Sequence, residues 1–149
     1  MTHNFLTHPE LTNNQMQFYY FQSPHKQITE SFSARVVRVH DGDTITVNWR
    51  ERDFDFPVRF SDTAAPELSE EGGFEARDWL EERILGTMVD IEVDPDNRVE
   101  KWGRILGRVF IGGIDIGAEE TRLGFSKTWS MRNDGKVIFK PQGSVPKWP

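Results

Sequence analysis

The chain has 149 residues, of which 36% are apolar and 28% are charged, as expected for one soluble globular domain with a core of its own. No stretch approaches the roughly 18 consecutive apolar residues of a membrane-spanning helix. The lack of cysteine excludes disulfides, thiol catalysis and thiolate metal ligands. The first residues carry no basic segment followed by an apolar one, which argues against a secretory signal and predicts a cytoplasmic protein.

The net charge of −6 is distributed unevenly along the chain. Residues 1–100 hold 9 Lys or Arg and 20 Asp or Glu, a net charge of −11, whereas residues 101–149 hold 9 Lys or Arg and 4 Asp or Glu, a net charge of +5. The acidic total gives no long-range attraction to a polyanion, but a basic face in the last third could contact phosphate. An ordinary solvated surface explains the same charges.

Three parts of the chain are distinguished by composition. Residues 1–30 are polar and are interpreted as an N-terminal extension, residues 31–130 form the domain, and residues 131–149 form a C-terminal tail rich in Pro and Gly. Thr12 is a suitable N-cap for a short helix in the extension. We expect the aromatic cluster from Phe18 to Phe21 to be buried against the domain, because an exposed apolar patch is a liability.

Alternating residues predict three successive strands at the start of the domain. Residues 33–49 alternate on both sides of Asp41-Gly42-Asp43, which predicts a hairpin. The same period of two continues over residues 53–60. Four apolar side chains there share one face, Phe54, Phe56, Val58 and Phe60, and the other face carries Asp53, Asp55, Pro57 and Arg59.

Helical spacing replaces this alternation over residues 69–87. Ala76, Leu80 and Ile84 recur every four residues, and Gly86 is a suitable C-cap. The segment therefore predicts one long helix after the first three strands.

Two more strands and a short helix complete the expected domain. Residues 88–94 and 104–113 alternate again, and residues 114–126 contain a short helix that ends at Gly124. This order predicts a mainly β fold with helices, namely a five-stranded Greek-key barrel of the OB type with one long and one short helix packed on it.

The sequence Asp41-Gly42-Asp43-Thr44 has two possible explanations. Asp-Gly is a common two-residue hairpin turn, because both residues tolerate positive φ. The second aspartate begins the next strand, however, and its carboxylate is the kind of oxygen ligand that a hard cation such as Ca²⁺ prefers. Taken alone, the segment favours the turn.

Two further segments could contact phosphate, although each also has an ordinary structural explanation. Arg59 precedes Glu67 by eight residues, and a glutamate near a helix N-terminus is favourable in any case. Lys101-Trp102-Gly103-Arg104 places two cations and an aromatic ring around a glycine, as in a polar turn or in a platform for a phosphate and a base.

These motifs in this order resemble the staphylococcal nuclease (thermonuclease) family, from about Ser33 to about Trp129. The resemblance implies an OB barrel that cleaves phosphodiester bonds of single-stranded DNA or RNA with one Ca²⁺ ion, or with Mg²⁺ or Mn²⁺. It implies catalytic roles for Arg59, Glu67 and Arg104, in which the two arginines stabilise phosphate charge and the glutamate acts as the base. The implied metal-site residues are Asp43, Asp41, Asp62 and Ala65, and the implied nucleic-acid-binding residues are Lys101, Trp102, Lys127 and Trp129.

The chain departs from the family pattern at one position. Ala64 stands where the family has a second metal-binding aspartate, and a methyl group cannot bind a cation. Asp62 lies two residues upstream, about 6–7 Å away on a regular strand. The metal site is therefore altered, or it binds weakly and the enzyme is slow, or the domain is a non-catalytic module that binds nucleic acid or protein. In the last case Trp102, Phe125 and Trp129 matter more than Glu67. Because Asp43, Arg59, Glu67 and Arg104 are all present, we favour a nuclease with an atypical, weakly occupied metal site.

Overall fold

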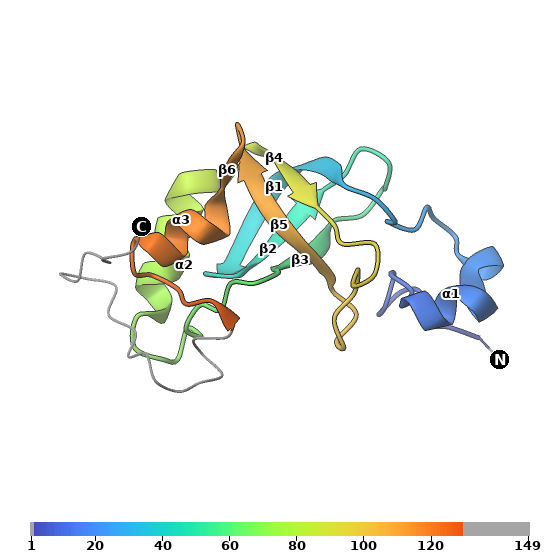
Figure 1. Cartoon of the computed structure of the whole chain (residues 1–149). Helices are drawn as coiled ribbons and strands as arrows, with labels where there is room; N and C mark the ends of the chain where they lie inside the picture. Colours follow the sequence, from blue (N-terminus) through green and yellow to red (C-terminus); the bar gives the residue numbers. More distant parts are fainter. Residues whose placement is uncertain (1, 130–149) are drawn as a thin grey trace.

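The computed structural model describes residues 2–129, and within them five strands close into a barrel (Figure 1). This confirms the predicted OB-type barrel with helices packed on it. The strands are β1 (Phe32–Asp41), β2 (Thr44–Asn48), β3 (Phe56–Phe60), β4 (Met88–Glu92) and β5 (Ile105–Ile111), and the short β6 (Ile114–Asp115) extends the sheet. The helices are α1 (Asn13–Tyr19), the 3-10 turn η1 (Tyr20–Gln22), α2 (Gly73–Ile84) and α3 (Ile116–Arg122).

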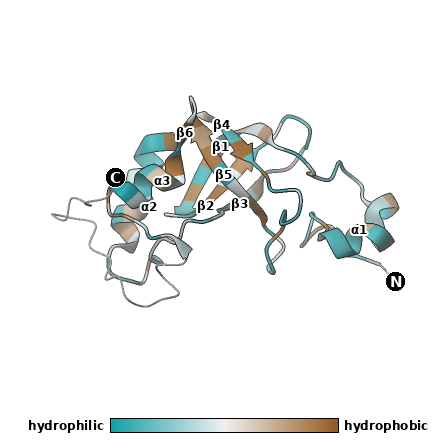
Figure 2. Cartoon of the chain, viewed as in Figure 1, coloured by the Kyte–Doolittle hydropathy of each residue, from teal (hydrophilic) through white to brown (hydrophobic). Residues whose placement is uncertain are grey.

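The barrel is closed by a parallel pairing between strands that are far apart in sequence. The strand order is β3-β2-β1-β4-β5-β6, and β3 also pairs with β5 in parallel, with Val58 opposite Ile105. The ten-residue β1 pairs with both β2 and β4, and two register shifts against β2 bend it around the barrel. Hydrophobic residues are concentrated on the strands, as Figure 2 shows.

Helices α2 and α3 lie at the same end of the barrel (Figure 1). The predicted stripe of α2 is confirmed, because Ala76, Leu80 and Ile84 are buried. Gly86, two residues after the last helical residue, has φ +80°, and Gly124 after α3 has φ +88°. Both glycines therefore end their helices through the left-handed conformation that other residues rarely adopt. None of the helices in residues 2–129 is long and apolar enough to cross a bilayer.

Strand β3 differs from the alternation that the sequence suggests. It begins at Phe56, three residues later than predicted, and Arg59 is buried although it lies on the polar face of the pattern. The arginine is buried because its guanidinium forms an ion pair with Asp43 and hydrogen bonds with main-chain carbonyls. Hydrophobic periodicity cannot reveal this kind of internal pairing.

The N-terminal extension contains the predicted helix, but its aromatic residues are not buried. Thr12 caps α1 and forms a capping box with Gln15. Phe18 is 71% exposed and Phe21 is 99% exposed, so the expected burial of this cluster is wrong. The extension docks instead through the buried side chains of Leu11 and Ile28 and through a network of hydrogen bonds. The predicted C-terminal tail, residues 131–149, lies outside the described residues.

Candidate active site

The Asp41–Thr44 hairpin is a tight turn pressed against the rest of the domain. Asp41 and Thr44 pair across it, and the main-chain N–H of Asp43 donates to Asp41 Oδ1 over 3.1 Å. The turn explanation expected a positive φ at Gly42, but Gly42 does not have one. A Cβ atom added to Gly42 would lie 2.6 Å from the Cβ of Ala65 and 2.9 Å from that of Ala76. Glycine is therefore needed here for close packing, which brings the two aspartates against the 61–67 loop.

Asp43 lies at the centre of the site, and its side chain is almost completely buried. Its Oδ2 accepts the Ala65 N–H over 2.9 Å and lies 3.3 Å from Arg59 Nη2, while its Oδ1 accepts the Thr44 hydroxyl over 3.1 Å. The pKa of Asp43 is raised to about 7. Burial is the largest cause, the neighbouring Asp41 carboxyl contributes by hydrogen bonding and by its charge, and Arg59 and the Ala65 N–H oppose the rise. The two acidic side chains therefore influence each other's protonation, and their combined negative charge favours a cation beside them.

Arg59 reaches this carboxylate from β3. Its Nη1 donates to the carbonyls of Phe60, over 2.9 Å, and Thr63, over 2.8 Å. The guanidinium also lies 5.1 Å from the centre of the Trp129 ring. These contacts fix the planar group between the acidic pair and the aromatic ring, which leaves only small movements available to it.

Arg104 faces the same carboxylates from the start of β5. Its Nε and Nη2 each lie 3.1 Å from an oxygen of Glu100, and its Nη1 lies 3.5 Å from Thr44 Oγ1. The hydrogen bonds that Arg104 donates to Glu100 are the main cause that raises the pKa of Arg104, and the negative charges of Glu100, Asp43 and Asp41 contribute. The arginine therefore keeps its charge, with 30% of its side chain exposed to solvent.

Among the described residues, the side chains of Glu67 and Asp62 form no hydrogen bond or ion pair with this cluster. Glu67 is exposed in the loop between β3 and α2, and its side chain makes no hydrogen bond or ion pair with any other described residue. Asp62 sits in the turn after β3 with φ +62°, an uncommon conformation that Asp tolerates better than most residues, and it lines two surface pockets beside Arg108. Because of this turn, Asp62 does not lie where a regular continuation of β3 would place it.

The four residues with an implied nucleic-acid role occupy two places. Trp102 is 66% exposed at the tip of the loop before β5, with Lys101 Nζ 5.1 Å from its ring centre. Trp129 lies over Arg59, and the backbone of Lys127 pairs with that of Ala64 through hydrogen bonds of 2.7 and 3.0 Å. Phe125 stacks on Trp79, 5.7 Å between ring centres, and belongs to the packing of α2.

Glu120 belongs to the surroundings of the site although the sequence analysis did not select it. Its carboxyl is completely buried, Oε2 contacts the Ser126 hydroxyl and Oε1 has no partner in the described part of the chain. Burial raises the pKa of Glu120 well above its ordinary value, and the charges of Asp43 and Asp41 add to this effect. The sequence did contain a signal for the burial of Glu120. It lies four residues after Ile116, and this spacing places both residues on the inner face of α3.

A divalent cation fits this donor set only in part. Asp41 and Asp43 offer adjacent carboxyl groups, and Mg²⁺ is often held by one or two carboxylates together with water and substrate phosphate. Within residues 2–129 no three His, Asp or Glu side chains are grouped so that they could hold a metal ion together. An ion at this place would therefore take most of its ligands from water or substrate.

The comparisons with known proteins give one relative and no function. No family model matches the chain. An uncharacterized protein of Bacillus anthracis is 29% identical over 123 residues, which cover 78% of this chain and 53% of that protein. The chain therefore spans about half the length of this relative.

Proposed function

We propose that this barrel is a metal-dependent phosphodiesterase that cleaves single-stranded DNA or RNA. The observation that carries the proposal is the convergence of Asp43, Arg59 and Arg104 from three strand ends on one spot, beside Asp41. A reaction that builds up negative charge on phosphate oxygens is stabilised by cations that are already in place. The resemblance of the sequence motifs to the staphylococcal nuclease family supports the same conclusion.

The proposed roles follow from the contacts of each residue. Asp41 and Asp43 would hold the divalent ion, which supplies a positive charge beside the scissile phosphate. Arg59 and Arg104 would donate N–H groups to phosphate oxygens and remain protonated throughout, because guanidinium does not release its proton in proteins. Glu67 would accept the proton of the attacking water as the new P–O bond forms, and the leaving oxygen would take a proton from solvent water as the old P–O bond breaks. This role rests on the resemblance alone.

A cleavage assay tests the proposal. Labelled single-stranded DNA and RNA are incubated with the protein in Ca²⁺, in Mn²⁺ and in EDTA. We expect metal-dependent cleavage that Arg104→Met and Glu67→Gln each reduce by about 10²–10³-fold. The exposed neighbour Glu71→Gln serves as the matched control and should retain wild-type activity. Cleavage in metal that does not exceed that of Glu67→Gln contradicts the proposal.

A second candidate function, binding without cleavage, is favoured because Arg59 and Arg104 are already paired with groups of this chain. Arg59 contacts Asp43 and two carbonyls, Arg104 contacts Glu100, and Ala64 supplies no carboxylate. This arrangement suits a module that binds nucleic acid or protein without cleaving it. Such a module shifts single-stranded DNA in a gel equally with and without EDTA, and its affinity depends on Trp102 and Trp129 more than on Glu67.

A further inference from the structure

The N-terminal extension holds the 95–104 loop, which presents Lys101, Trp102 and Arg104. The side-chain amide of Asn13 donates to the Pro95 carbonyl over 3.0 Å. The His8 ring lies so close to Gly103 that a Cβ atom added there would be 2.6 Å from His8 Cδ2. Figure 1 shows this loop, between β4 and β5, beside the first residues of the chain.

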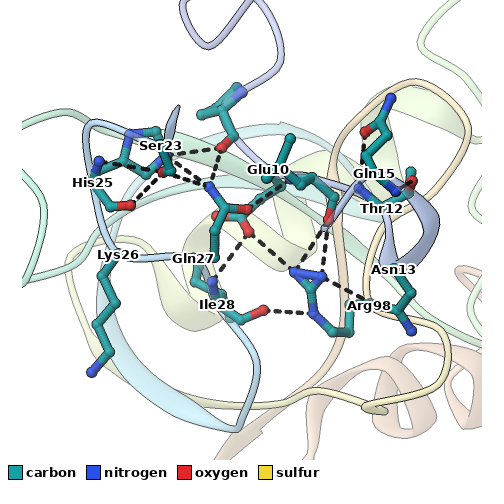
Figure 3. Close-up of polar contacts among 12 residues, drawn as sticks. Glu10, Thr12, Asn13, Gln15, Ser23, His25, Lys26, Gln27, Ile28 and Arg98 are labelled. Atoms are coloured by element: carbon teal, nitrogen blue, oxygen red, sulfur yellow. Dashed lines mark hydrogen bonds and ion pairs between the residues drawn. The ribbon is translucent and has the colours of Figure 1, made fainter. Parts of the chain in front are cut away.

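Arg98 fixes the base of the same loop to the extension. Its buried guanidinium donates to the carbonyls of Ile28, over 2.8 Å, and Leu11, over 2.9 Å, and lies 3.5 Å from Glu10 Oε2. Figure 3 shows the Arg98 side chain directed at Glu10, Asn13 and Ile28. Because these partners are buried, the extension and the loop form one rigid unit rather than two segments that meet by chance.

A series of rings continues from the loop across this unit. The exposed His8 ring packs against Gly103, the residue that follows Trp102 in the sequence. His3 lies 6.5 Å from His8, and Tyr19 lies 5.7 Å from His3, between ring centres. The Nε2 of His3 donates to the main-chain carbonyl of His8 over 2.6 Å, which orders the His3 ring, and the Thr7 hydroxyl lies 2.9 Å from His8 Nδ1, which orders the His8 ring. His3 and His8 meet edge to face at 75°, so they do not cover each other in a parallel stack.

We propose that His8, His3 and Tyr19 form a base-stacking track that extends the single-strand binding surface beyond Trp102. The inference rests on the proposed function, since it places bases that flank the scissile phosphate. Bases of unpaired strands stack on aromatic and imidazole rings, at about 1–3 kcal/mol per base. The track begins beside the exposed Trp102 with its neighbouring Lys101, which makes a nucleic-acid strand a better fit than a protein partner.

The charge of the extension indicates how the track binds. Residues 1–30 contain one lysine and two glutamates, and the lysine already pairs with Glu51. Phosphate contacts there are therefore few, and affinity comes from stacking. Affinity gained along the track should depend weakly on salt, whereas Lys101 should contribute to the salt dependence.

The test compares oligothymidylates of about 4 and about 16 nucleotides, the range of single-strand sites on OB barrels. Binding to the full chain is measured by fluorescence anisotropy in EDTA, without cleavage. We expect His3→Ala/His8→Ala to weaken binding of the longer strand by about tenfold or more and to leave the shorter strand unchanged. If Phe replaces His8 in place of Ala in this double variant, much of the lost affinity for the longer strand should return, because position 8 then keeps a ring. Phe21→Ala, which removes a fully exposed ring outside the track, is the matched control.

Each outcome decides the inference. An equal loss for both oligonucleotides means that the histidines act by positioning the loop, and overturns the track. An equal effect of Phe21→Ala, or a dimer in sedimentation that Phe21→Ala dissociates, indicates a protein interface and also overturns it. If the wild-type protein binds both lengths with equal affinity, the track is wrong while the proposed function stands. If it binds neither, both fail.

Discussion

Glu10 and Asp43 are both buried carboxylates in contact with arginine, but their other neighbours differ. Glu10 contacts Arg52 through Oε1 and Arg98 through Oε2, and Oε2 also accepts the Ile28 N–H. Figure 3 shows the contacts of Glu10 with Arg98 and Ile28. Asp43 contacts one arginine and one further carboxyl, that of Asp41. One negative charge thus lies between two positive ones in the first cluster, whereas two negative charges lie together in the second.

This difference separates a structural contact from a site. In the Glu10 cluster no second carboxyl group repels Glu10. The rings of Trp49, Phe54 and Phe56 surround Arg52, with 4.6–5.5 Å between the guanidinium carbon and each ring centre. It joins the extension to the barrel. The Asp43 cluster places like charges in contact, which costs stability unless a cation joins them. Residues retained at such a cost are found at functional sites more often than elsewhere.

The largest expected effect is the loss of the Glu10 charge. Glu10→Gln leaves two buried guanidinium groups without a counter-charge, and breaking a buried pair in this way costs about 3–5 kcal/mol of unfolding free energy. Urea denaturation monitored by tryptophan fluorescence measures the change. Glu51→Gln, which removes the exposed partner of Lys26, is the control and should change stability by less than about 1 kcal/mol. If both variants change the unfolding free energy by a similarly small amount, the Glu10 cluster does not stabilise the attachment of the extension to the barrel.

The two clusters also differ in how far the sequence revealed them. Asp41, Asp43 and Arg104 were selected because they lie in short motifs that together resemble the staphylococcal nuclease family, although the local turn signals alone favoured an ordinary turn at Asp41–Thr44. Glu10 and Arg98 are 88 residues apart, and no local pattern connects them. The burial of Arg59 and the exposure of Phe18 were missed for a related reason. Hydrophobic periodicity indicates which face of an element is apolar. It does not indicate which polar side chain is buried with a partner, or which apolar side chain remains exposed.

The barrel itself could be predicted because it depends on patterns that repeat along each element. The alternation of β1 and β2 and the four-residue spacing of Ala76, Leu80 and Ile84 determine which faces turn inward. The starting point of β3 could not be predicted, because Asp53 and Phe54 continue the alternation beyond the residues that pair with β2.

The next effect is a pH dependence that arises from the Asp43 cluster between pH 4 and 8. Folding raises the pKa of Asp43 from 3.8 to about 7, so the folded protein holds a proton that the unfolded chain releases between these pH values. The stabilisation is fully present below about pH 4 and is lost as the pH rises through about 7. The whole change corresponds to about 4 kcal/mol.

Asp43→Asn tests this dependence, because an amide cannot titrate. In metal-free buffer the variant should gain stability relative to the wild type as the pH rises from 4 to 8, as measured by urea denaturation at each pH. Saturating Ca²⁺ should reduce the difference, since a bound cation favours the ionised carboxylate. The exposed Asp53→Asn is the control, with no change in slope. A wild type and an Asp43→Asn variant that lose stability in parallel would place Asp43 in an ordinary ion pair with Arg59.

The smallest of the three effects tests whether Glu120 belongs to the strained cluster. Its Oε1 is buried without a partner among the described residues, and its pKa is raised, so the folded state gains little from its charge. Replacement of such a group by an apolar side chain of similar volume is neutral or stabilises by about 1–4 kcal/mol. We expect Glu120→Leu, combined with Ser126→Ala, to raise the unfolding free energy by about 1–2 kcal/mol. The gain should be larger at pH 8 than at pH 5, because the unfolded wild-type chain releases the Glu120 proton that burial keeps in the folded state, and the charges of Asp43 and Asp41 add to this effect. Thermal denaturation at the two pH values measures this. A loss of stability would contradict this expectation. The same gain in the Asp43→Asn background would separate Glu120 from Asp43 and leave the acidic pair at the hairpin as the whole of the strained site.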